Sequence, residues 1–258
     1  MTHVSHADIF STTTIFEKLK TRARPYLWLA PLIAGTTWIL MLAVLFLYWI
    51  ASGRPKLPLQ SNPYVAYVYR KYLQMYTPLT HPSSFISDIG AFHLKPVFIA
   101  GCTLTSISFL ATILSVHYAR YSKHFYDLHD SNWRKAISVL ALFFGTAACL
   151  SLFLLTIFDT YRYHVVHRRL LLSCFANLAS SAVCTQVVWL DQAWKASSFV
   201  RLRRWLVLSD VIVVVEVCLG IAFTGLLYTG NRRVAGILEW IITVTGGLYL
   251  LTFMGILR

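Results

Sequence analysis

Residues 136–158 read AISVLALFFGTAACLSLFLLTIF, a run of 23 amino acids without a charged side chain. An α-helix rises about 1.5 Å per residue, so such a run can cross a hydrocarbon layer about 30 Å thick. Five further predominantly apolar runs of 20 to 24 residues are 27–50, 97–116, 170–190, 205–228 and 237–257. Only helices and closed barrels satisfy the backbone inside lipid, and these runs lack the alternation of barrel strands. The sequence therefore predicts an all-α integral membrane protein, a six-transmembrane-helix bundle.

The composition supports a single membrane domain. The chain has 258 residues, of which 57% are hydrophobic and only 13% charged. The residues outside the six runs are too few and too scattered to form a soluble domain of their own. We therefore divide the chain into an N-terminal segment, 1–26, and a six-span membrane domain, 27–258. The first run is too long for a cleaved signal peptide, so we expect a retained signal anchor.

The distribution of positive charge predicts an orientation. Of 23 Lys and Arg residues, 13 lie on the side that six spans assign to both termini. Charges far from a span count little, and without Arg70 and Lys71 the balance is 13 against 8. We therefore place both termini in the cytoplasm.

The net charge of +13 also bears on binding partners. Basic residues border the spans on both faces instead of lining one groove, which argues against nucleic acid. Ordinary helix-flanking anchors explain much of this charge. The alternative is attraction to anionic inner-leaflet lipid, at about 1 kcal/mol per surface Lys or Arg. The candidate headgroup-binding residues are Lys18, Lys20, Arg22 and Arg24 before the first span, with Lys195, Arg201, Arg203 and Arg204 before the fifth.

One long loop, residues 51–96, separates the first two spans. It contains several prolines and a central group of tyrosines. Tyrosine favours the interface between membrane and water, where its ring is shielded and its hydroxyl is hydrated. We predict an ordered first extracellular loop that folds back over the outer end of the bundle.

Glu216 is an acidic residue near the middle of the fifth predicted span. Insertion of a charge at that depth costs about 2.5–3.5 kcal/mol, which a neutral, protonated carboxyl largely avoids. We expect a structural hydrogen bond between helices, with Asn177, Ser173 or Thr105 as the partner. A proton or headgroup site, as in a proton-coupled carrier, is the alternative. The six spans show no inverted repeat that would support a carrier.

Polar residues converge on the outer ends of the predicted spans. Their members are Asp88, His93, Asp159, His164, His167 and Glu239. A His-x-x-His pair beside two aspartates could hold zinc or carry out acid–base chemistry on a lipid ester. A hydrogen-bonded rim between the loop and the helix ends explains the pattern equally well. We predict a structural rim with no metal and no cofactor.

Four short motifs contain or adjoin these residues, and their order along the chain is informative. They are FISDIGA at 85–91 with Lys95-Pro96, IFDT at 157–160 with His164 and His167, Glu239-Trp240, and YLLTF at 249–253. Together they resemble the FRAG/DRAM/Sfk family of six-span membrane proteins, and its fungal Sfk-like branch most closely. The resemblance extends from the first span to the last. It assigns a motif rim to Ser87, Asp88, Gly90, Asp159, His164, His167 and Glu239.

The resemblance implies a function in membrane lipid biology. The Sfk-like branch is linked to phosphatidylinositol 4-kinase function at the plasma membrane and to transbilayer lipid organisation. The DRAM branch is associated with lysosomes and autophagy, and the FRAG branch with lipid remodelling of GPI anchors. We therefore expect a non-enzymatic regulator or scaffold of phosphoinositide signalling at the plasma membrane. Its expected partners are membrane lipids, including anionic phosphoinositides, and a lipid-kinase complex.

Two alternatives remain open. One is a GPI-anchor lipid-remodelling enzyme or accessory factor that uses Asp88, Asp159, His164 and His167. The other is location in an endomembrane, such as the vacuole or lysosome, the Golgi or the ER. Because the chain ends at Arg258 directly after its last span, contact with a kinase complex is expected through the N-terminal segment or the short basic loops.

Overall fold

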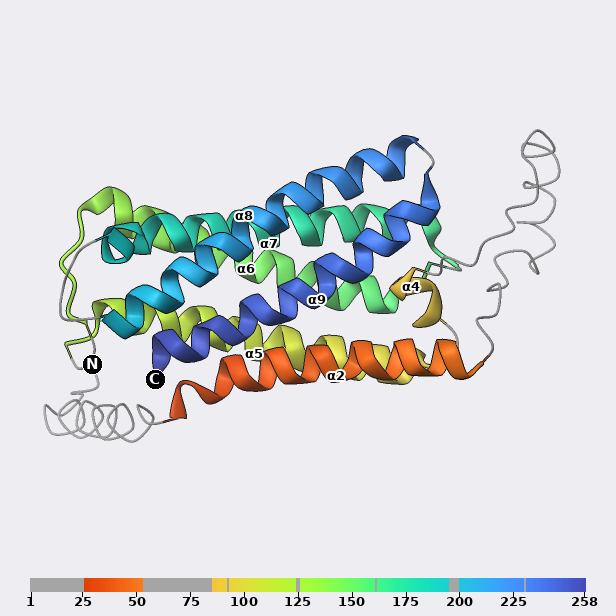
Figure 1. Ribbon diagram of the computed structural model, residues 1–258, viewed down its shortest axis with the longest axis horizontal. Helices are drawn as coiled ribbons and strands as arrows, with labels where there is room; N and C mark the ends of the chain where they lie inside the picture. Colours follow the sequence, from red (N-terminus) through yellow and green to blue (C-terminus); the bar gives the residue numbers. More distant parts are fainter. Residues whose placement is uncertain are drawn as a thin grey trace, which may run out of the picture.

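The computed structural model describes residues 26–52, 85–91, 93–123, 126–160, 162–194, 200–229 and 231–258 (Figure 1). In these residues the chain forms six long helices and one short one. They are α2 (Leu29–Ala51), α4 (Ile86–Ile89), α5 (Lys95–Tyr121), α6 (Asn132–Ile157), α7 (His164–Trp194), α8 (Val200–Thr229) and α9 (Arg232–Leu257).

Each predicted span coincides with one long helix. The six long helices of the described residues are long and apolar enough to cross a membrane, which confirms the six-span fold class. Several helices run beyond the predicted spans, most clearly α7, which extends from His164 to Trp194. Polar residues can continue a helix at the membrane surface because their side chains reach water and headgroups. At the start of α5, Pro96 occupies the first turn, where its missing N–H would have no helical partner.

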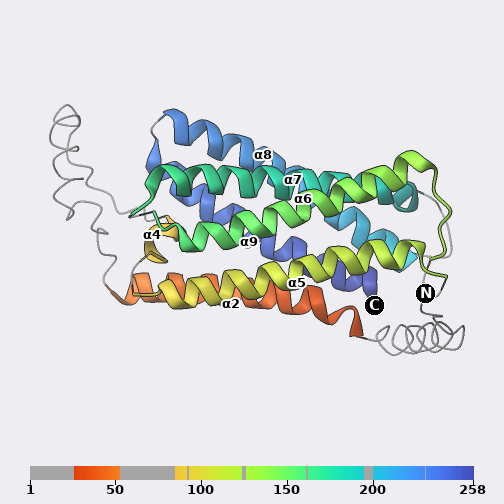
Figure 2. The same cartoon turned by 180° about the vertical axis from the view of Figure 1, so that it is seen from behind.

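The long helices form a closed ring. Each packs against the next along the chain, in the order α2, α5, α6, α7, α8 and α9, and α9 returns to pack against α2 (Figures 1 and 2). A smaller contact between α5 and α9 crosses the ring. The first and last helices of the bundle are therefore direct neighbours.

Glycines allow the close approach of α2 and α9. A Cβ atom at Gly35 would lie 2.6 Å from Leu251 Cδ2 and 3.2 Å from the Gly247 carbonyl oxygen. A Cβ atom at Gly247 would lie 2.9 Å from Ile39 Cγ1. Small residues permit such backbone contact between membrane helices. At neighbouring Gly246 the nearest atom would be Glu216 Oε1, at 3.9 Å, so an added Cβ atom would make only an ordinary van der Waals contact there.

The outside of the bundle is apolar, as expected for a surface in contact with lipid. Ile107, Val214 and Ile221 are 64%, 63% and 70% exposed. Polar side chains such as Thr112 and Ser209 are fully buried between the helices. This distribution supports the assignment of the six helices to a membrane.

The bundle has two distinct ends. We call the end where α2 begins and α9 ends the terminal end, and the end where α2 finishes and α9 begins the loop end (Figure 1). At the loop end, Ile86 and Ile89 of α4 pack into a cluster with Leu45 and Phe98. A Cβ atom at Gly90, which follows α4, would lie 2.8 Å from Phe98 Cγ, so α4 is held tightly against α5.

The last part of the long loop therefore folds onto the bundle, as predicted. Residues 53–84, which include the tyrosine group, lie outside the described residues. The same holds for residues 1–25, nearly all of the predicted N-terminal segment.

Candidate functional site

Glu239 connects α4 to the bundle at the loop end. It lies in the second turn of α9 and is 2% exposed. Its Oε2 accepts a hydrogen bond from the backbone N–H of Ile86 at 2.8 Å. That N–H begins α4 and has no partner within the helix. Ser87 is buried nearby, and the Asp88 carboxyl interacts electrostatically with Glu239. Three predicted rim residues are thus brought together.

Asp159 forms a second group at the loop end, directly after α6. One carboxylate oxygen, Oδ2, lies 2.7 Å from Lys95 Nζ, and the other accepts the Arg162 backbone N–H at 2.7 Å. Burial alone would raise the pKa of Asp159, but these hydrogen bonds and the Lys95 charge hold it below its ordinary value. The carboxylate therefore links the start of α5 to the α6–α7 connection.

The two predicted rim histidines have different surroundings. His164, at the first residue of α7, is exposed, whereas His167 is 3% exposed. His167 Nδ1 makes a 2.7 Å hydrogen bond with the Phe158 carbonyl oxygen. In the described part of the chain, no three His, Cys, Asp or Glu groups are arranged to hold a metal ion. The His-x-x-His pair is split between the surface and the interior.

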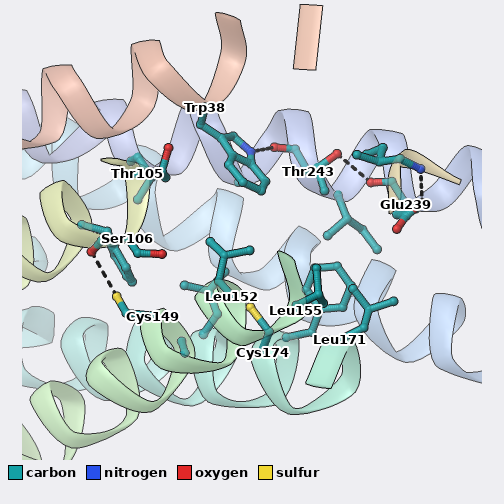
Figure 3. Close-up of a pocket in the computed structure, with 18 of the residues that line it drawn as sticks. Trp38, Thr105, Ser106, Cys149, Leu152, Leu155, Leu171, Cys174, Glu239 and Thr243 are labelled. Atoms are coloured by element: carbon teal, nitrogen blue, oxygen red, sulfur yellow. Dashed lines mark hydrogen bonds between the residues drawn. The ribbon is translucent and has the colours of Figure 1, made fainter. Parts of the chain in front are cut away.

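An interior cavity of about 110 Å³ lies beneath this rim (Figure 3). Its lining includes Ser87 and Glu239 at the loop end and Tyr249 deeper along α9. Trp38 Nε1 donates to the Thr243 carbonyl oxygen at 2.6 Å, and Thr243 Oγ1 donates to the Glu239 carbonyl oxygen at 2.8 Å. A cavity of this size has room for several water molecules.

Two buried hydroxyls face this region without a partner in the described residues. They are Thr105 Oγ1 and Ser106 Oγ on α5, and both residues line the cavity. Buried polar groups are usually hydrogen-bonded. The cavity therefore combines largely apolar walls with a few polar groups, which is the usual character of a small-molecule or lipid site.

Glu216 also lines the cavity, but its partner differs from the prediction. Its Oε1 accepts a hydrogen bond from Thr245 Oγ1 on α9. The expected partners were wrong: α8 packs against both α7 and α9, and the Glu216 side chain bonds to α9, while Asn177 Nδ2 on α7 donates to the Ser173 carbonyl oxygen of its own helix. Thr105 is on α5, on the other side of the ring. The expected type of interaction, a polar link between two helices, is observed.

An ion-pair network at the terminal end was not predicted from the sequence. Arg120 is fully buried, and its Nε and Nη2 atoms donate to Asp130 at 2.7 and 2.8 Å. Asp191 Oδ1 lies 3.4 Å from Arg120 Nη2, and Asp191 Oδ2 lies 2.8 Å from Arg134 Nη1. The Arg120 guanidinium also stacks over Trp189, 4.9 Å from the ring centre. The network joins α5, α6 and α7.

The connection between α5 and α6 supplies Asp130 and closes over this network. Burial would raise the pKa of Asp130, but the hydrogen bond and charge of Arg120 hold it below its ordinary value. Tyr126 packs edge-on against Trp189 and donates its hydroxyl to the Ile256 carbonyl oxygen at 2.8 Å. A useful signal was present in the sequence, since Asp130 and Asp191 occur among basic residues at the same predicted membrane surface.

The basic residues before the predicted fifth span are exposed at the terminal end. Arg201, Arg203 and Arg204 are exposed in the first turns of α8 and form no ion pair with another described residue. Arg201 and Arg204 border a hollow that Trp205 and Leu208 also line. The other predicted headgroup contacts, Lys18, Lys20, Arg22, Arg24 and Lys195, lie outside the described residues.

Comparison with known proteins identifies the family. A family model described as the Frag1/DRAM/Sfk1/Cwh43P N-terminal domain matches residues 26–255. Searches of curated proteins and of solved structures find no match. The match covers the six membrane helices, except for the last two residues of α9, and both groups of rim residues, as the sequence resemblance predicted. The chain belongs to the Frag1/DRAM/Sfk1/Cwh43P family of multi-pass membrane proteins.

Proposed function

We propose that this protein is a non-enzymatic regulator or scaffold of phosphoinositide signalling and membrane lipid organisation. In this proposal both termini are cytoplasmic, so the terminal end of the bundle faces the inner leaflet. The observation that carries it is the group of exposed arginines on α8, Arg201, Arg203 and Arg204. Their position at a helix end places them at the depth of lipid headgroups.

The ion-pair network strengthens this argument. Asp130 and Asp191, two acidic residues of the terminal end, are paired with Arg120 and Arg134. The exposed arginines of α8 form no ion pair with a described residue, so their charge is available to partners outside the bundle. Arginine binds phosphate through paired N–H groups, and each surface cation adds about 1 kcal/mol of attraction to anionic lipid. Phosphoinositide headgroups carry the phosphates that suit such a surface.

The rest of the proposal concerns partners and location. We assign the protein to the plasma membrane, where an inner-leaflet cation cluster could concentrate substrate lipid for a phosphatidylinositol 4-kinase complex. The loop-end residues support a non-enzymatic role because their polar atoms maintain structure. Asp159 is engaged by Lys95, and Glu239 is engaged by Ile86. The GPI-anchor remodelling alternative requires Asp88, Asp159, His164 and His167 to act together, and the exposed position of His164 gives it less support.

The test compares two double variants with equal loss of charge. R201Q/R204Q removes two exposed cations of the terminal end, whereas R162Q/R169Q removes two exposed arginines of the loop end. Each variant replaces the wild-type protein in cells that carry a fluorescent reporter of phosphatidylinositol 4-phosphate. We expect only the terminal-end variant to lower the plasma-membrane signal, as deletion of the protein should. An unchanged signal in the deletion cells, or an equal effect of both variants, would contradict the proposal.

A further inference from the structure

A groove on the side of the bundle opens toward the lipid between α7, α8 and α9. Its volume is about 360 Å³. Small residues give it depth, with Ala176 and Ala179 on α7, Gly220 on α8 and Gly246 on α9. A Cβ atom at Gly220 would have no neighbouring atom within 4 Å, so the groove has free space at this position. Because the helices span a membrane, the medium outside this groove is hydrocarbon.

The groove has the length of one leaflet. Along α7 its lining runs from Leu172 to Ala182, which at about 1.5 Å per residue is roughly 15 Å. The hydrocarbon layer is about 30 Å thick, so this is the depth of one acyl chain in one leaflet. At its deep end the groove shares Glu216, Gly246 and Tyr249 with the interior cavity. The two spaces are therefore adjacent.

A positively charged side chain, that of Arg168, lies at the loop end of the same groove. The Arg168 guanidinium lies over the Tyr228 ring, with its Cζ 5.8 Å from the ring centre. Arg168 is one helical turn before Leu172 on α7, and Tyr228 is one turn after Thr224 on α8, and both Leu172 and Thr224 line the groove. Arg168 is exposed and forms no ion pair with a described residue. Stacking on a ring fixes a guanidinium while its N–H edges stay free for phosphate.

We propose that this groove binds a glycerophospholipid from the leaflet at the loop end. The lipid phosphate contacts Arg168, and one acyl chain lies along Ala176, Ala179 and Gly220. Charge complementarity selects the phosphate, and the length and free space of the groove select the chain. This site is at the opposite end from the proposed phosphoinositide surface and does not depend on it.

The test uses a photoactivatable phosphatidylcholine with a diazirine in the middle of one acyl chain. The purified full chain is placed in nanodiscs that contain this lipid, illuminated, digested and analysed by mass spectrometry. We expect adducts concentrated on residues 172–182 and 216–224. Gly220→Phe should remove them by filling the groove. Gly225→Phe is the matched control, because Gly225 is also on α8 with nothing within 4 Å of a Cβ atom and does not line the groove.

Arg168→Gln tests the phosphate contact without changing the groove. It should reduce groove adducts about tenfold, the value of one charge-assisted hydrogen bond. Arg169→Gln, at an exposed neighbouring arginine that has no described ring contact, should leave the yield unchanged. An unlabelled groove in the wild-type protein would indicate that a second protein chain covers it and would overturn the proposal. Equal yields of groove adducts from all four variants would also overturn it. The same holds if an unlabelled sterol abolishes labelling of the groove while unlabelled phosphatidylcholine does not.

Discussion

Glu216 and Thr245 connect α8 to α9 inside the membrane by a single side-chain hydrogen bond. The oxygen that accepts this bond is also present in glutamine. Glu216→Gln should therefore leave the free energy of unfolding unchanged, whereas Thr245→Val should lower it by about 0.6–1.7 kcal/mol. Unfolding of the purified variants in mixed micelles measures both values. A larger loss in Glu216→Gln than in Thr245→Val would show that the protein needs an ionisable group at this position.

Arg120 and Asp130 provide a second prediction for single residues. Asp130→Asn leaves the buried Arg120 guanidinium with only one of its two carboxylate partners, Asp191. The free energy of unfolding should therefore fall by about 3–5 kcal/mol. Arg134→Gln is the control, because Arg134 is 26% exposed and such a pair contributes less than about 1 kcal/mol. Equal losses from the two substitutions would show that burial of Arg120 does not determine the cost.

The same pair makes stability depend on pH. The pKa of Asp130 is lowered in the folded protein. The ionised carboxylate therefore contributes its full stabilisation at a pH above about 3.9, the pKa of an Asp in the unfolded chain. This stabilisation is lost as the pH falls through the pKa of Asp130 in the folded protein. Wild-type protein should therefore lose more melting temperature between pH 7 and pH 3 than Asp130→Asn. A parallel decrease in both proteins would contradict this assignment.

Among the glycines of the described residues, an added Cβ atom would be most crowded at Gly255 of α9, which lies against Trp205 of α8. A Cβ atom at Gly255 would lie 2.1 Å from Trp205 Cδ2, so the indole ring would have to shift from its packed position. Gly255→Ala should therefore destabilise the bundle by about 1–3 kcal/mol. Gly225→Ala, where the added atom meets nothing within 4 Å, should be neutral or favourable by up to about 1 kcal/mol. Thermal unfolding in detergent distinguishes the two, and equal melting temperatures would contradict the packing argument.

The elements also show what a sequence can predict. The six spans were predictable because lipid requires a long apolar run wherever a helix crosses it. The rim residues were predictable as a group because polar side chains collect at the ends of such runs. The contact of Arg120 with Asp191 was not, because Asp191 lies 71 positions away and reaches Arg120 only through the packing of α5, α6 and α7. The partner of Glu216 was missed because α8 has two neighbours, α7 and α9, and only the packed bundle shows that Glu216 bonds to α9.

For the whole molecule, the remaining prediction is its orientation in the membrane. Lys123 at the terminal end and Asn231 at the loop end are both exposed. In a variant whose exposed Cys218 is replaced by Ser, a membrane-impermeant maleimide should label Asn231→Cys on intact cells. It should label Lys123→Cys only after permeabilisation. The reverse pattern would place the termini outside, and protection of both sites on intact cells would contradict residence in the plasma membrane.

The contact between α2 and α9 has a consequence for biosynthesis. A ribosome that has completed Ala51 must still translate every residue up to Arg232 before α9 begins to emerge. At 5–20 residues per second this interval lasts about 10–40 s. During that time the face of α2 around Gly35 borders lipid or an insertion chaperone instead of its final neighbour, α9. Nascent chains interrupted before α9 should therefore be substrates for membrane quality control.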